Sequence, residues 1–145
     1  MHETYVNHGC LWAFHTDEAA KEHLLRFAFE DWWVGDVVSF HTGTPSLYSI
    51  EALEDCELLL WTKAAKDEAP TRIPKLEKYF RIRYQTALMV LQRRIVDQVS
   101  QTAEDRYADL LATYSRLEQR LPQYVIASYL GITPQHLSRI KRQSR

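Results

Sequence analysis

The stretch ASYLGITPQHLSRIKR, residues 127–142, constrains the fold of this chain more than any other part of the sequence. Two short runs of helical periodicity lie on either side of Gly131, and Thr133 followed by Pro134 suits the first residues of a helix. Ala127 is small enough for a close helix crossing. The apolar residues that could form a shared core are Ile126, Leu130, Ile132, Leu137 and Ile140. The sequence therefore predicts a helix-turn-helix over this stretch.

The second helix of the pair is basic and contains no acidic residue. At about 100° per residue, Leu137 and Ile140 mark its buried side, and polar side chains cluster opposite them. Arginine can donate two hydrogen bonds to guanine and glutamine can pair with adenine, while other cations contact phosphates. A solvated basic tail is the alternative, but it would not need the small, turn and capping residues at these offsets. We predict that double-stranded DNA is bound by Thr133, Gln135, His136, Ser138, Arg139, Lys141 and Arg142.

A long helix is predicted upstream of this pair, because neither glycine nor proline occurs between Lys75 and Ser100. Such a helix of about 26 residues would be roughly 40 Å long. Its apolar side could pack on its own domain, but a helix of this length favours a dimer seam. The seam residues would be Phe80, Tyr84, Leu88, Leu91, Ile95 and Val99. Thr102 and Asp105 suit a capping box for the next helix, with an apolar side that continues to Leu117.

The residues before Trp61 have the pattern of short strands separated by turns. YVNHGCLWAFH and EHLLRFAF are rich in aromatic and branched residues, and TDEAAK would connect them as a hairpin. Turn signals at VGD and TGTPS precede two more strands, LYSIEAL and CELLLW. This spacing predicts an antiparallel roll or sandwich. We expect Thr62 to cap a short helix that ends at Pro70.

Charge divides the 145-residue chain into two unlike halves. Residues 1–69 carry 13 acids against 4 Lys and Arg, and residues 70–145 carry 6 against 14. The basic half is expected to bind a polyanion.

No apolar run is long enough to span a bilayer, and Cys10 and Cys56 suit the core of a reduced, cytoplasmic protein. The scattered histidines form no metal motif and no catalytic constellation occurs, so we expect neither a metal site nor an enzyme.

Taken with the helix-turn-helix, four segments resemble the Crp/Fnr family of bacterial transcription regulators. GCLWAFHTDEAAKEHLLRF is similar to the middle hairpin of that family, WWVGDVVSFHTGTPS to its phosphate-binding cassette, IPKLEKYFRIRYQTALMVLQRRI to its dimerisation helix, and LPQYVIASYLGITPQHLSRIKR to its DNA-reading unit. The resemblance implies an α+β chain with a partial, cyclic-nucleotide-binding-like β-roll over residues 1–74, a dimerisation helix over 75–101 and an all-α helix-turn-helix domain over 102–145. The base-reading positions of the family match Pro134, Gln135 and Arg139.

The resemblance also implies a regulator that binds a pseudo-palindromic operator as a homodimer, with RNA polymerase as a candidate further partner and no membrane contact. The candidate effector pocket comprises Trp32, Trp33, Gly35, Asp36 and Ser46. Ser46 and Leu47 stand where cyclic-nucleotide binders have an arginine for the phosphate, so cyclic AMP is not expected and no cofactor is assigned. About three dozen residues of the family pattern would precede residue 1. The alternative function is a ligand-binding or dimerisation module that has lost independent DNA binding.

Overall fold

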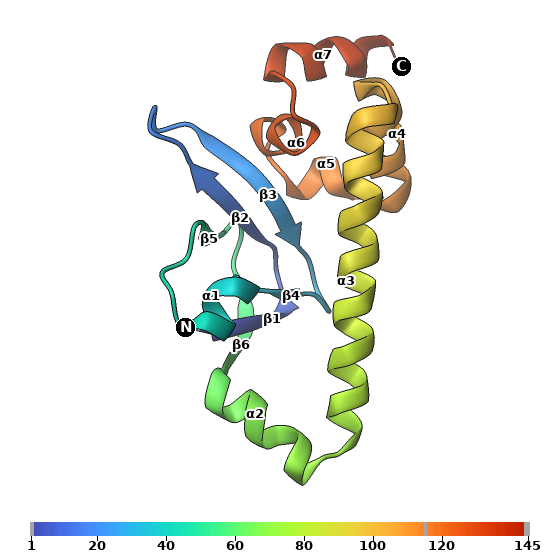
Figure 1. Ribbon diagram of the computed structural model, residues 1–145. Helices are drawn as coiled ribbons and strands as arrows, with labels where there is room; N and C mark the ends of the chain where they lie inside the picture. Colours follow the sequence, from blue (N-terminus) through green and yellow to red (C-terminus); the bar gives the residue numbers. More distant parts are fainter. Residues whose placement is uncertain (1, 115, 144–145) are drawn as a thin grey trace. The chain divides into compact units, whose positions relative to one another are not determined.

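The computed structural model describes residues 2–114 and 116–143. The chain forms two compact units, each described here by itself. The first contains the residues up to Lys63 together with those from Arg116 onward, and the second contains the residues from Ala64 to position 115. The helix-turn-helix therefore belongs to the same compact unit as the strands (Figure 1). The division into domains over residues 1–74, 75–101 and 102–145 stays a prediction.

The strands of the first unit form two antiparallel sheets. In one sheet β1 (His2–His8) pairs with β4 (Trp33–Val34) and β6 (Glu57–Thr62), in the order β4-β1-β6. In the other, β2 (Leu11–Thr16) pairs with β3 (Glu22–Ala28) and β5 (Ser49–Ala52), in the order β3-β2-β5. The predicted antiparallel arrangement and the hairpin through residues 16–21 are confirmed.

Both sheets contribute to one apolar core. Its fully buried members come from four strands: Val6, Leu11, Ala13, Ala28 and Val34. Trp32, Tyr48, Cys56 and Leu58 pack against this cluster. The run from Leu11 to Phe14 is buried at every position, whereas a strand with one solvated face would alternate. The outer face of β2 must therefore be covered as well.

The cover for that outer face is α6 (Gln123–Leu130), which lies against β3 (Figure 1). Trp12 and Phe27 are register partners on β2 and β3, so their side chains share one face of the sheet. The Trp12 ring lies 6.0 Å from the ring of Tyr124, and the Phe27 ring lies 4.8 Å from that of Tyr129. Aromatic contacts of this kind account for a strand that is apolar on both faces.

A short helix follows β4 that the sequence pattern did not indicate. This helix, α1 (Val37–Thr42), begins after Asp36, whose carboxylate accepts a hydrogen bond from the backbone N–H of Ser39. It ends at Gly43, which has a φ of 78°. The β-branched residues at its start favour a strand. The helix forms instead because the two caps provide hydrogen-bond partners for backbone groups at its ends.

The second unit is made of α2 (Lys63–Arg72), α3 (Lys75–Ser100) and α4 (Ala103–Thr113), with Lys63 itself in the first unit. The predicted bounds of the long helix and the capping box of Thr102 and Asp105 are confirmed. The prediction that Pro70 ends the preceding helix was wrong. Pro70 lies inside α2, and the N–H of Ile73 still donates to the carbonyl of Ala69 at 2.8 Å.

A buried lysine joins α2 to α3 within this unit. Lys66 is only 7% exposed, and its ammonium lies 4.7 Å from the ring centroids of both Phe80 and Tyr84. Its Nζ also donates to the Tyr84 hydroxyl. The aromatic faces and the hydroxyl compensate for part of the hydration that the ammonium loses on burial.

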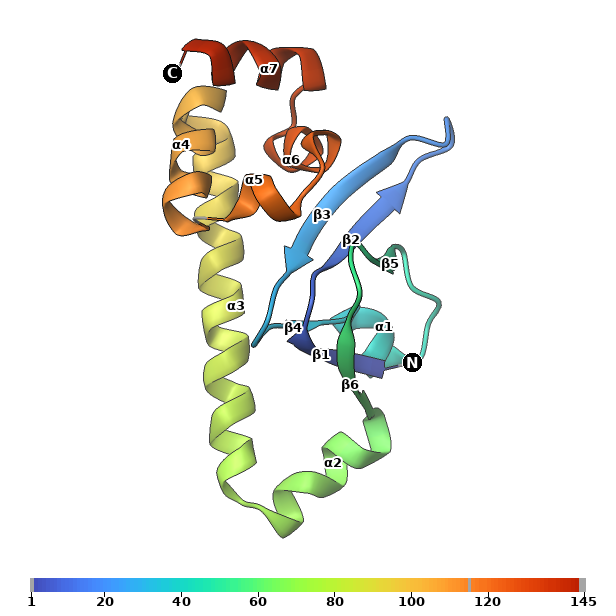
Figure 2. The same cartoon turned by 180° about the vertical axis from the view of Figure 1, so that it is seen from behind.

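The remaining helices are α5 (Leu117–Arg120), α6 and α7 (Pro134–Gln143). The expectation that one helix continues from Thr102 to Leu117 was wrong, since α4 ends at Thr113 and Tyr114 has non-helical angles. Seen from both sides, α6 lies between the strands and α7 (Figures 1 and 2). In the described residues, no helix combines the length and apolar character needed to cross a membrane.

Candidate nucleic-acid interface

The turn between α6 and α7 is built by local backbone chemistry. Gly131 has a φ of 69°, a left-handed conformation that favours glycine. The N–H of Gly131 donates to the carbonyl of Ser128 at 3.1 Å, and the N–H of Ile132 donates to that of Ala127 at 3.0 Å. This pairing satisfies carbonyls at the end of α6. The hydroxyl of Thr133 then accepts a hydrogen bond from the N–H of His136 at 3.2 Å and caps α7.

A core of buried apolar side chains lies between the two helices. The side chains of Ala127 and Leu137 have no exposed surface, and those of Ile126 and Ile140 have 2% or less. Ile132 is half-buried. Val125, which the sequence pattern did not single out, is also fully buried. Because the core fills one side of α7, the opposite side of that helix faces solvent.

The side chains on the solvent side of α7 include those with base-reading chemistry. Gln135, Arg139 and Arg142 are exposed, as the helical periodicity predicts. Their amide and guanidinium groups are the donors that bidentate contacts with adenine and guanine require. Pro134, at the first helical position, offers no side-chain donor. The exposed face can therefore make directional hydrogen bonds from Gln135 and Arg139.

The other predicted contact residues are engaged within the protein. The Lys141 ammonium lies 2.5 Å from the carboxylate of Glu118 on α5. Ser138 is half-buried, and its hydroxyl accepts a hydrogen bond from Nε2 of Gln123 at 2.6 Å. His136 is half-buried. A phosphate contact from Lys141 or Ser138 would therefore have to share or replace its present interaction with Glu118 or Gln123.

Gln123 is a residue of this face that sequence reasoning missed. It is the first residue of α6 and is exposed, and its Nε2 donates to the carbonyl of Pro134 at 3.3 Å as well as to Ser138. The link joins the start of α6 to the outer side of α7. Only the helix crossing brings these positions together, so no local pattern could have revealed the pair.

The candidate effector residues Gly35, Asp36 and Ser46 lie close together around the start of α1. One carboxylate oxygen of Asp36 caps α1, and the other accepts hydrogen bonds from the Ser46 hydroxyl at 2.9 Å and from the N–H of Leu47 at 3.3 Å. Burial would raise the pKa of Asp36, but the hydrogen bonds from Ser39 and Ser46 outweigh it and lower the pKa below its usual value. The Asp36 carboxylate and the Ser46 hydroxyl therefore form hydrogen bonds within their own loop and stabilise its conformation.

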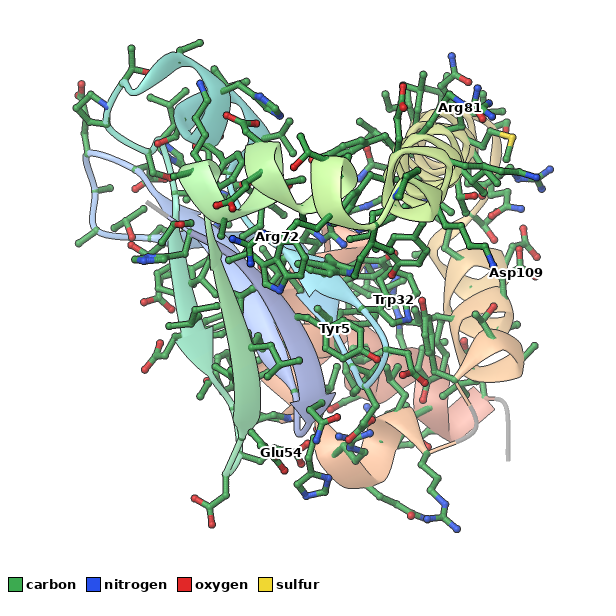
Figure 3. The ribbon with its side chains drawn as sticks, turned by 90° about the horizontal axis from the view of Figure 1, so that it is seen from below. Tyr5, Trp32, Glu54, Arg72, Arg81 and Asp109 are labelled. Carbon is green, nitrogen blue, oxygen red and sulfur yellow. The ribbon has the colours of Figure 1, made fainter. Side chains whose placement is uncertain are left out.

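The two tryptophans of the candidate pocket have different surroundings. Trp33 is 8% exposed and its ring packs against those of Tyr5 and Trp61 at 5.4 and 5.8 Å. Trp32 is half-buried, and the guanidinium of Arg26 lies 6.0 Å from its ring centroid (Figure 3 labels Trp32). Arg26 also donates to the carbonyl of Trp33 at 3.0 Å. Trp33 is thus a core residue, and Trp32 lies beside a cation that sequence reasoning did not assign.

Tyr48 completes the surroundings of the Gly35 turn. Its hydroxyl donates to the carbonyl of Gly35 at 2.8 Å. Burial raises the pKa of Tyr48 to about 12, and the nearby Asp36 carboxylate acts in the same direction. The phenol is therefore neutral near pH 7.

Across residues 2–114 and 116–143, no His, Cys, Asp and Glu side chains gather in a group that could hold a metal ion.

The predicted seam residues of α3 divide into a covered and an exposed set. Phe80 is 7% exposed and Tyr84 is half-buried, and both lie against Lys66. Leu88, Leu91 and Ile95 are 56%, 54% and 54% exposed, and Val99 is 86% exposed. Met89, Val90 and Val96, which were not assigned to the seam, are exposed as well. The exposed apolar side chains of α3 therefore lie mostly after Tyr84, and they cover more than a single stripe of the helix.

Comparison with known proteins identifies the fold. No protein-family model and no curated protein sequence matches the chain. Among solved structures, FixK2 from Bradyrhizobium japonicum is 17% identical with a TM-score of 0.83, over 98% of this chain and 73% of that one. The c-di-GMP responsive regulator CLP of Xanthomonas campestris is 13% identical with a TM-score of 0.75, over 98% of this chain and 76% of that one.

A third solved structure is described as a member of the family that the sequence resembles. TTHA1359 of Thermus thermophilus, a Crp/Fnr-family transcriptional regulator, is 18% identical with a TM-score of 0.76, over 99% of this chain and 74% of that one. At these identities the likeness is one of backbone architecture. The expected combination of a cyclic-nucleotide-binding-like roll, a long helix and a helix-turn-helix is confirmed, and the chain has the fold of the Crp/Fnr transcription regulators.

Proposed function

We propose that this protein is a sequence-specific, DNA-binding transcription regulator that acts in the cytoplasm as a homodimer. The observation that carries the proposal is the solvent face of α7, where Gln135, Arg139 and Arg142 are exposed on a helix whose start is capped and whose inner side packs in a buried apolar core. A helix of this kind fits the major groove, where its side chains can reach base edges. The shared fold supports the same function.

Dimerisation is proposed to use the exposed apolar surface of α3. Leu88, Leu91, Ile95 and Val99 recur at spacings of three and four residues and expose half or more of their surface. Side chains at this spacing can pack against the same helix of a second copy. Two recognition helices held by such a seam would reach successive major grooves about 34 Å apart, so the operator would be pseudo-palindromic.

The effector region is proposed to be degenerate with respect to cyclic nucleotides. Asp36 and Ser46 hydrogen-bond to each other and to the backbone of their own loop. A bound cyclic phosphate would need a cation at the position of Ser46 or Leu47, and neither residue supplies one. Regulation would then depend on another ligand or on the dimer itself.

The proposed function is tested by selecting a preferred duplex from random DNA and titrating it with the protein at two salt concentrations. A true DNA binder loses affinity steeply as salt rises, because bound counterions are released from the phosphates. Absence of salt-dependent binding would instead support a module that no longer binds DNA.

The residue-level test is Arg139→Ala. We expect a loss on the order of 1 to 3 kcal/mol on the selected duplex and a much smaller loss on random DNA, since a bidentate base contact carries sequence information. Lys21→Ala is the control, because it removes an exposed cation from the roll. Equal loss on both duplexes would show that Arg139 contacts only phosphate.

A further inference from the structure

The helix-turn-helix is held against the strands by polar as well as apolar contacts. The backbone N–H of Leu24 on β3 donates to the hydroxyl of Ser128 on α6 at 3.0 Å. The rings of Tyr124 and Tyr129 lie on the aromatic face formed by Trp12 and Phe27. Apolar contacts stabilise the docked arrangement but leave its orientation loosely defined, because they have little directional preference.

Directional contacts come from a three-residue ionic cluster at the edge of this interface. Both Nη atoms of Arg120 on α5 donate to the carboxylate of Glu30 at 2.8 Å, one to each oxygen. Nη2 also donates to Glu54, which is labelled in Figure 3. The guanidinium lies 4.6 Å from the ring centroid of Phe29. A bidentate pair on a fixed aromatic surface defines the direction of the guanidinium plane.

The acceptors of this cluster are themselves fixed by the strands. Glu30 follows β3, and its Oε1 also accepts the backbone N–H of Gly9 at 2.9 Å. Glu54 follows β5. The Arg120 guanidinium holds the pKa of Glu30 at about 2, and the two carboxylates in turn raise the pKa of Arg120. Glu30 and Arg120 are therefore both ionised across the physiological pH range.

Partial burial makes this cluster stronger than a typical surface ion pair. The side chain of Arg120 is 26% exposed, and those of Glu30 and Glu54 are 35% and 32% exposed. Solvent still screens the charges in part, but the fork geometry and the three converging side chains give a network with defined geometry. The cluster lies between segments that are 90 and 66 positions apart in sequence.

We propose that Arg120, Glu30 and Glu54 are positioning residues for DNA binding: they fix the helix-turn-helix on the roll, so that α7 moves with the strands as one body. The proposal rests on the proposed function as a dimeric DNA binder. The alternative is that the Leu24–Ser128 hydrogen bond and the aromatic contacts of α6 are sufficient to fix the helix-turn-helix on the strands without the cluster. The core of α6 and α7 does not involve the cluster, so a single half-site would be read equally well without it.

The cluster is therefore expected to raise the affinity of the dimer for a duplex that contains two half-sites. When one half of a dimer is bound, the effective concentration of the other half at its site depends on the stiffness of the connection between them. A helix-turn-helix that is loose on the roll samples many orientations. Losing the cluster should lower the affinity for two half-sites while the affinity for one stays unchanged.

The test compares Arg120→Met with the matched variant Arg116→Met, which removes an exposed cation at the start of the same short helix. Each protein is titrated with the duplex obtained by selection and with a duplex that retains one half of it. Hydrogen exchange of the Leu24 amide is measured in parallel, because this N–H is bonded only while α6 is docked on β3. Glu54→Gln serves as a milder variant that keeps the Glu30 pair.

For Arg120→Met we expect faster exchange at Leu24 and a loss of about tenfold or more on the two-half-site duplex, with no change on the single half-site. Glu54→Gln should change both in the same direction by less, and Arg116→Met should change neither the exchange nor the ratio of the two affinities. Faster exchange with an unchanged ratio, or unchanged exchange, would overturn the positioning role. A wild-type protein that binds no duplex, or binds both equally, would instead refute the proposed function.

Discussion

The turn glycine of the helix-turn-helix gives a stability prediction that follows from the structure alone. At Gly131 φ is 69°, and an added Cβ would meet no atom within 4 Å. Gly131→Ala therefore creates no collision, and its cost is that of holding an L-residue in the left-handed region, roughly 1 to 2 kcal/mol. The lower entropy of the unfolded chain offsets about 0.4 to 1 kcal/mol of this. The net loss in the free energy of unfolding is expected to be on the order of 1 kcal/mol.

Gly43 supplies a matched control in the same compact unit. It has a φ of 78° at the end of α1, and an added Cβ there would also meet nothing within 4 Å. Urea titrations of Gly131→Ala and Gly43→Ala should show similar losses, and Gly131→Asn should lose less, because asparagine tolerates this region. No loss in Gly131→Ala would mean that the turn does not require the left-handed conformation. A loss of about 3 kcal/mol or more would mean that the added methyl group collides with a neighbour.

The remaining predictions concern the dimer surface and the ionic cluster. Leu91→Glu should give a monomeric mass by light scattering, because burying a charge between two α3 helices opposes their association. The control Leu47→Glu changes a side chain of the roll that is 79% exposed and should leave the mass unchanged. An unchanged mass for Leu91→Glu would refute the seam. Glu30 has a folded-state pKa of about 2, depressed from 4.5, so its stabilisation is complete above pH 4.5 and is lost as pH falls toward 2. The difference in urea midpoint between wild type and Glu30→Gln should shrink over that range, and a difference that persists at pH 2 would contradict this assignment.

Features specified by neighbouring residues were predictable from the sequence. The turn at Gly131, the cap at Thr133 and the uninterrupted stretch that becomes α3 each depend on residues a few positions apart. Local chemistry of this kind does not require knowledge of the tertiary structure. The exposed face of α7 follows from the same periodicity.

Features that depend on contacts between distant segments could not be predicted from local sequence patterns. The residues of α1 favour a strand, and the helix forms because Asp36 and Gly43 cap it and Ser46 holds the Asp36 carboxylate. The composition of the segment around Leu11 to Phe14 predicted a strand, but nothing local indicated that both of its faces are buried or that α6 covers one of them. The ionic partners of Arg120 lie 90 and 66 positions away, so their meeting depends on the fold as a whole.

The two-sided burial of β2 has a practical consequence for dissecting this protein into parts. A fragment that stops before α5 would leave the indole of Trp12 and the phenyl ring of Phe27 without the tyrosines that cover them. Bare aromatic surface on a sheet promotes self-association and precipitation. Truncation from the C-terminal side is therefore expected to yield protein that aggregates, because α6 covers the aromatic face of the sheet as well as packing against α7.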